Sequence, residues 1–148
     1  MSTTFDLRGD YTATASLPAY YQRGVIVLDK TFDISAGLPA ATTGTVDTTG
    51  LAATETIDVF EIPADVLVLS ASLTATTGTT ATGSETMSFG YDGAATAFVS
   101  AFDTSTTGAS STCSDTLYFP VAKSAIVTGN TATITAGVIH VRLICVPA

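Results

Sequence analysis

Few residues in this chain have side chains that could work together in acid–base, nucleophilic or metal chemistry. The 148 residues include one histidine, His140, and two cysteines, Cys113 and Cys145. A zinc site would need all three together with a carboxylate, and their spacing matches no common zinc motif. One histidine leaves one possible base for a serine nucleophile, and the sequence contains neither a G-x-S-x-G motif nor a phosphate-binding glycine pattern. We therefore predict no catalytic residue, no metal site and no cofactor.

The acidic and thiol side chains have simpler explanations. Asp92 precedes Gly93 in a turn, which accounts for it. Asp103 and Asp115 flank a hydroxyl-rich loop. Calcium binding by this loop stays an open alternative, although the residue spacing of a calcium-binding loop is absent. For the two cysteines we predict free thiols, because the chain is expected to assemble in a reducing cytosol.

Composition excludes several kinds of partner. Charged residues make up 12% of the chain, about half of the ~25% usual in soluble domains, and the net charge is −8 with five basic residues. Phosphate contacts need Lys and Arg, so we predict binding neither to nucleic acid nor to an anionic membrane surface. No apolar run approaches the ~20 residues of a membrane span, and the first residues lack the layout of a signal peptide.

The stretch from Thr56 to Thr77 predicts two strands separated by Pro63. In the first, apolar residues fall on both faces, which indicates either a bulge near Val59 and Phe60 or burial on both sides. In the second, the leucines Leu67 and Leu69 alternate with Val66 and Val68, and we assign the leucine face to the core. We then expect Val66 and Val68 to be covered by a second subunit or by the N-terminal segment.

The rest of the chain adds strands and turns but no helix, since no apolar set recurs at helical spacing. Asp92-Gly93 and Gly129-Asn130 each predict a two-residue hairpin, and a short strand is expected near 45–47. In the final strand, His140 and Arg142 should face away from the core. About eight strands at regular spacing predict an all-β fold, an antiparallel β-sandwich that is jelly-roll-like.

Residues 1–23 contain few aliphatic side chains and predict an extended N-terminal arm, followed by a single β-sandwich domain at 24–148. An arm without a core of its own cannot offset the entropy of its ordering by local packing. We therefore expect its aromatic residues to anchor it on a partner, although the arm could instead cover its own domain. The Arg8-Gly9-Asp10 tripeptide is interpreted as a chance match. The predicted anchors are Phe5, Tyr11, Tyr20 and Tyr21.

Three segments resemble small structural proteins of tailed bacteriophages, in particular head-decoration (cement) proteins. These segments are VFEIPADVLVLSASLTATT, FGYDG with the following FVSAFD, and ATITAGVIHVRLICV. The resemblance implies a non-enzymatic β-sandwich that assembles in the bacterial cytoplasm, forms a trimer and binds the major capsid protein. It would lie on the outer capsid surface of the virion and stabilise the head. The alternatives are a tail or head-fibre module that binds a receptor, and a secreted adhesin or pilin-like domain.

Overall fold

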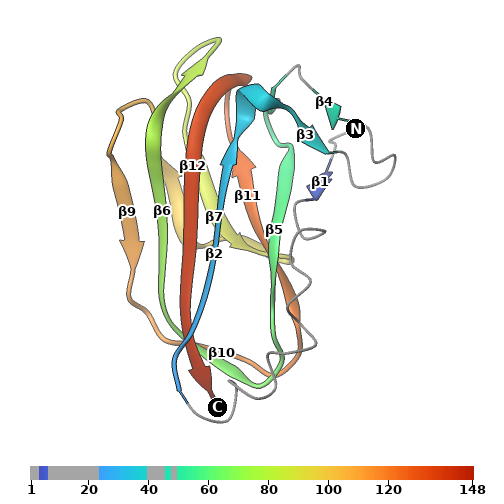
Figure 1. Cartoon of the computed structure of the whole chain (residues 1–148), viewed down its shortest axis with the longest axis vertical. Helices are drawn as coiled ribbons and strands as arrows, with labels where there is room; N and C mark the ends of the chain where they lie inside the picture. Colours follow the sequence, from blue (N-terminus) through green and yellow to red (C-terminus); the bar gives the residue numbers. More distant parts are fainter. Residues whose placement is uncertain (1–3, 7–23, 40–45, 48–49) are drawn as a thin grey trace.

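The chain folds into two β-sheets packed face to face, as the computed structural model shows for residues 4–6, 24–39, 46–47 and 50–148 (Figure 1). Sheet A has the strand order β1-β5-β11-β7-β8, and sheet B has the order β10-β6-β12-β2, with β9 also paired to β6. The predicted all-β sandwich is confirmed. Sheet A consists of β1 (Thr4–Asp6), β5 (Thr56–Ile62), β11 (Lys123–Gly129), β7 (Met87–Tyr91) and β8 (Ala94–Phe102). Sheet B consists of β10 (Leu117–Phe119), β6 (Val66–Ala81), β12 (Ile134–Pro147), β2 (Ile26–Asp33) and β9 (Ser110–Cys113).

The connection from β2 to β5, residues 34–55, contains the remaining elements. The 3-10 helix η3 (Ile34–Ala36) follows β2 directly, and Asp33 caps it by accepting a hydrogen bond from the backbone N–H of Ser35. Strands β3 (Leu38–Pro39) and β4 (Val46–Asp47) then pair with each other. The short strand expected near 45–47 is thus confirmed.

The core lies between the two sheets and is built around aromatic rings from sheet A and from β10 of sheet B. The rings of Phe60 and Phe89 meet edge to face at 6.4 Å, and those of Tyr91 and Phe119 do so at 4.9 Å. Such pairs add to the stabilisation that burial of the rings already gives. The assignment of these aromatic residues to the core is confirmed.

The assignment of the two faces of β6 was wrong for its first four residues, 66–69. Val66 and Val68 are fully buried in the core of their own sandwich, whereas Leu67 and Leu69 are only half-buried. The cause is a register shift against β12, where Leu69 has no partner between Val68 and Ser70. One extra residue exchanges the two faces of a strand, so the pattern reverses before Leu73, which is buried as predicted.

The irregular pattern in β5 has the first of its two predicted causes, a bulge. The register against β11 shifts between Asp58 and Phe60, so that Val59 is the extra residue. Val59 and Phe60 are therefore adjacent in sequence and both buried. The predicted bulge at this position is confirmed.

One of the two predicted hairpins exists. The Asp92-Gly93 turn connects β7 to β8 with Gly93 at φ 97°, a conformation that favours glycine. The Gly129-Asn130 hairpin was wrong, because β11 and β12 belong to different sheets. The buried carboxylate of Glu85 holds this crossing in place by accepting hydrogen bonds from the backbone N–H groups of Asn130, Thr131 and Ala132.

Apart from β7 to β8 and β9 to β10, each connection between the main strands from β2 onward crosses from one sheet to the other. Consequently β12 lies between β6 and β2, which are far from it in sequence. The jelly-roll-like arrangement of the sandwich stays a prediction.

The start of the chain touches sheet A. Residues Thr4–Asp6 form β1 and pair in parallel with β5, from Thr4 opposite Thr56 to Asp6 opposite Asp58. The predicted anchors Tyr11, Tyr20 and Tyr21 lie outside the described residues.

Candidate interaction surface

The outer face of sheet B carries a group of apolar side chains that the core does not use. Val25 directly precedes β2, and Val27 alternates with the buried Ile26 and Leu28 at the start of this strand. The two valines are 62% and 52% exposed. The half-buried members from β6 and β12 are not among the residues packed against the core. Pairing of β12 with both neighbours brings the three strands together at this end of the sheet. We call this surface the apolar patch: Val25, Val27, Leu67, Leu69, Ile144 and Val146.

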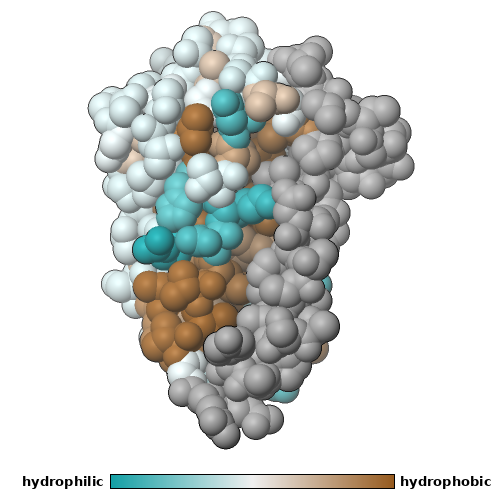
Figure 2. Space-filling model, viewed as in Figure 1, coloured by the Kyte–Doolittle hydropathy of each residue, from teal (hydrophilic) through white to brown (hydrophobic). Residues whose placement is uncertain are grey.

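Figure 2 shows this face of the molecule with a hydrophobic area toward the C-terminal end of β12 and a hydrophilic band beside it. Single exposed apolar residues are normal on protein surfaces, but contiguous ones indicate contacts with other molecules. The apolar patch is therefore the strongest candidate for an interaction surface among the described residues.

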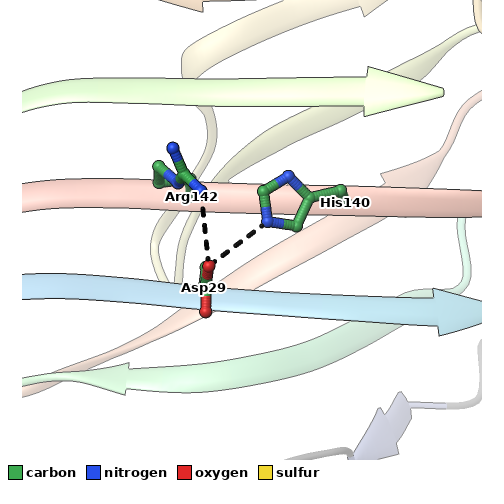
Figure 3. Close-up of polar contacts among 3 residues, drawn as sticks. All are labelled: Asp29, His140 and Arg142. Atoms are coloured by element: carbon green, nitrogen blue, oxygen red, sulfur yellow. Dashed lines mark hydrogen bonds and ion pairs between the residues drawn. The ribbon is translucent and has the colours of Figure 1, made fainter. Parts of the chain in front are cut away.

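The hydrophilic band contains a small charge cluster between β2 and β12. Asp29 Oδ2 lies 3.4 Å from Nε2 of His140 and 3.6 Å from a terminal guanidinium nitrogen of Arg142 (Figure 3). His140 and Arg142 both face away from the core, as the sequence predicted, and Arg142 is directly opposite Asp29 in the register. Half-exposed pairs at such distances stabilise a fold only slightly, so the cluster mainly sets the polarity of this border.

The opposite end of the apolar patch has an acidic border. Tyr118 of β10 is directly opposite Leu67, is 50% exposed, and donates a hydrogen bond of 3.1 Å from its hydroxyl to Asp65 Oδ1. This bond, followed by burial and the Asp65 charge, raises the pKa of the Tyr118 hydroxyl. The apolar patch thus has the Asp65 carboxylate at one end, and at the other end the Arg142 guanidinium and the His140 imidazole, both next to the Asp29 carboxylate.

The cysteines are placed apart in sheet B. Cys113 of β9 pairs with Ala71 on one side of β6, and Cys145 of β12 pairs with Val68 on the other side. Both are free, as predicted. Burial raises the pKa of the Cys145 thiol to about 11, which keeps it protonated and unreactive near neutral pH.

The loop at Asp103 is explained by its own hydrogen bonds. Its carboxylate accepts a hydrogen bond of 2.9 Å from the backbone N–H of Ser105, and bonds from Ser105 lower the pKa of Asp103. Among the described residues, no group of three or more His, Cys, Asp or Glu side chains could hold a metal ion. The described part of the chain also contains no helix that is long and apolar enough to cross a membrane.

The sequence-based interface residues do not coincide with the apolar patch. Val66 and Val68 belong to the core, and only the backbone of Phe5 is described. The patch residues were missed although one signal pointed to them. The sequence from Val25 to Leu28 is apolar on both faces, yet β2 is an edge strand, so Val25 and Val27 stay exposed.

Comparison with known proteins identifies the fold but no family. Neither a protein-family model nor a curated protein sequence matches the chain. A chain in the acidic stable capsid structure of Helicobacter pylori bacteriophage KHP30 is similar over 82% of this chain and 86% of its own length, with a TM-score of 0.59 and 11% identity. A chain in the cyanophage Pam1 capsid asymmetric unit is similar over 84% and 86%, with a TM-score of 0.53 and 22% identity. At these identities the likeness establishes a common fold.

Proposed function

We propose that this chain is a structural protein of a bacteriophage virion, without enzymatic activity. The observation that carries the proposal is the fold shared with chains of two phage capsid structures over more than four-fifths of each chain. The sequence resemblance to phage structural proteins supports it independently. An exposed apolar patch on a sandwich stabilised by its own core also suits a protein that assembles with others.

Within the virion, we propose the role of a decoration protein that binds the major capsid protein on the outer capsid surface. The net charge of −8 supports an outer position, because an acidic surface is repelled by the phosphates of packaged DNA. Assembly would take place in the bacterial cytoplasm. The resemblance adds self-association as a trimer.

We assign attachment to the capsid to the arm at 1–23, with Phe5, Tyr11, Tyr20 and Tyr21 as its anchors. Aromatic side chains dominate the binding energy of many interfaces, and an extended segment can reach across a neighbouring subunit. The pairing of β1 with β5 ties the start of the arm to its own sheet. The three tyrosines between β1 and Gly24 are therefore the residues we expect to contact the capsid.

Two variants separate attachment from folding: deletion of Met1 to Gln22, and replacement of Tyr11, Tyr20 and Tyr21 by Ser in the full chain. The deletion removes β1 and should lower the melting temperature by a few degrees while unfolding stays cooperative. The tyrosine variant keeps β1 and should melt like the wild type. Both should lose co-sedimentation with undecorated capsids.

The matched control is the single variant Tyr118→Ser in the full chain. It removes an exposed tyrosine outside the arm and should keep capsid binding. Unchanged capsid binding by the tyrosine variant would refute attachment through the arm. Failure of the wild-type chain to co-sediment with any candidate capsid would count against the decoration role itself.

A further inference from the structure

We propose that the apolar patch pairs with the same patch of a second copy, through a twofold axis that passes near Cys145 of β12. This inference deepens the proposed self-association. Self-association is measured on the isolated protein in solution. Failure of this inference can therefore be told apart from failure of the proposed capsid binding.

The first argument is the shape and chemistry of the surface. The apolar patch lies on three neighbouring strands, so it offers a continuous sheet face rather than isolated side chains. Two sheets that pack face to face bury alternate residues of both, about 10 Å apart. Val25 and Val27, more than half exposed in the single chain, would be covered in such a pair.

The second argument is the distribution of charge at the two ends of the patch. Arg142 precedes Cys145 by three residues, and Ala148 follows Cys145 by three residues. The backbone N–H of Ala148 donates a hydrogen bond of 2.9 Å to the Asp65 carbonyl, so Asp65 is at the level of Ala148. When β12 of one copy runs antiparallel over β12 of the other, Arg142 of each copy comes opposite the level of Asp65 in its partner.

This arrangement repeats the same favourable contact twice, as a twofold interface requires. The Asp65 carboxylate is exposed and bonded to Tyr118, and the Arg142 guanidinium is 47% exposed, so both can reach a partner. A partner of another kind would need acidic and basic groups in the reverse order along its own apolar face. An identical copy has this order without further assumption.

The same levels fix the direction of pairing. In a parallel arrangement, Arg142 of one copy and Asp65 of its partner would be six residues apart along β12, or about 20 Å, so the contact between them forms only when the two β12 strands run antiparallel. The proposal therefore predicts an assembly with an even number of copies. If the chain also forms the proposed trimer, the twofold contact would join two trimers.

Sedimentation velocity over a range of concentrations tests the proposal. The wild-type chain should associate into assemblies of even copy number. Val27→Asp and Ile144→Asp place a charge inside the apolar contact and should each raise the dissociation constant at least tenfold, which corresponds to about 1.4 kcal/mol. Val121→Asp is the matched control, because Val121 is 57% exposed and lies outside the patch.

A charge exchange tests the twofold geometry and does not disturb the apolar residues. Asp65→Lys and Arg142→Glu should each weaken association about tenfold or more, and the double variant should recover most of the loss. Arg142→Glu replaces the ion pair with Asp29 by a repulsive contact in the single and the double variant alike. Recovery therefore reports a contact between copies, and circular dichroism confirms that each variant is folded.

Three results would overturn the proposal. One is a wild-type chain that stays monomeric up to about 100 μM, a concentration well above that of typical specific contacts. Another is an assembly that Val27→Asp and Ile144→Asp leave unchanged, or that contains three copies only. The third is a monomeric wild type in which those two variants lose capsid binding, which would assign the patch to the capsid instead.

Discussion

Cys145 shows how one buried side chain can make the stability of the whole domain depend on pH. Its thiol is inaccessible in the core of sheet B, and burial raises its pKa from 9.0 to about 11. The folded state therefore favours the neutral thiol more strongly than the unfolded state does. This contribution to stability is complete below pH 9 and is lost as the pH rises through about 11.

We predict that the free energy of unfolding of the wild type falls by about 2 kcal/mol more than that of Cys145→Ala between pH 8 and pH 11. Urea unfolding at several pH values measures the difference. Cys113→Ala should behave like the wild type, since Cys113 is only half-buried. A wild type and a Cys145→Ala variant with parallel pH profiles would show that the thiol is not desolvated in the fold.

At the scale of the element, the shift at Leu69 decides which side chains of β6 stabilise the sandwich. We predict that Val68→Ala lowers the free energy of unfolding by about 2 kcal/mol, from lost burial and the cavity left behind. Leu67→Ala should cost less than about 1 kcal/mol although it removes more atoms, because Leu67 faces outward. Chemical denaturation at a concentration that keeps the chain monomeric measures both, and equal losses would contradict the shift.

The same strand shows where inference from sequence stops. Alternation over β6 predicted the strand and most of its core residues, such as Leu73, because a period of two is visible in the residues themselves. The shift at Leu69 leaves no local signal, since it is set by the pairing with β12. In β5, by contrast, two adjacent buried residues revealed the bulge at Val59.

The turn that joins two paired strands of one sheet was predictable from the sequence, whereas the connection between the two sheets was not. The Asp92-Gly93 turn joins two neighbours in one sheet, so local sequence suffices. The segment at Gly129-Asn130 has the composition of a hairpin but crosses between sheets, held by Glu85 from a distant loop. The apolar patch was missed for a related reason, because only the strand order shows that the outward valines of β2 have no cover.

At the scale of the whole molecule, the inner and outer faces of the sheets have different roles. The inner faces supply stability, and the outer face of sheet B provides an apolar surface with ordered charges at its ends. The core of the sandwich does not require a partner, because the residues that face inward are already buried in the single chain. Substitutions on the outer face of sheet B should therefore leave the chain folded.

The central place of β12 in sheet B has a consequence for synthesis. Asp29 and His140 face each other across neighbouring strands although they are 111 positions apart. Sheet B therefore cannot close on the ribosome until residues 134–147 have emerged, and contacts of this range fold slowly. A chain truncated after Asn130 should show no cooperative unfolding by circular dichroism, and a cooperative transition would refute this order of events. Nascent chains should accordingly lack the outer face of sheet B, and with it the apolar patch, until translation has passed β12.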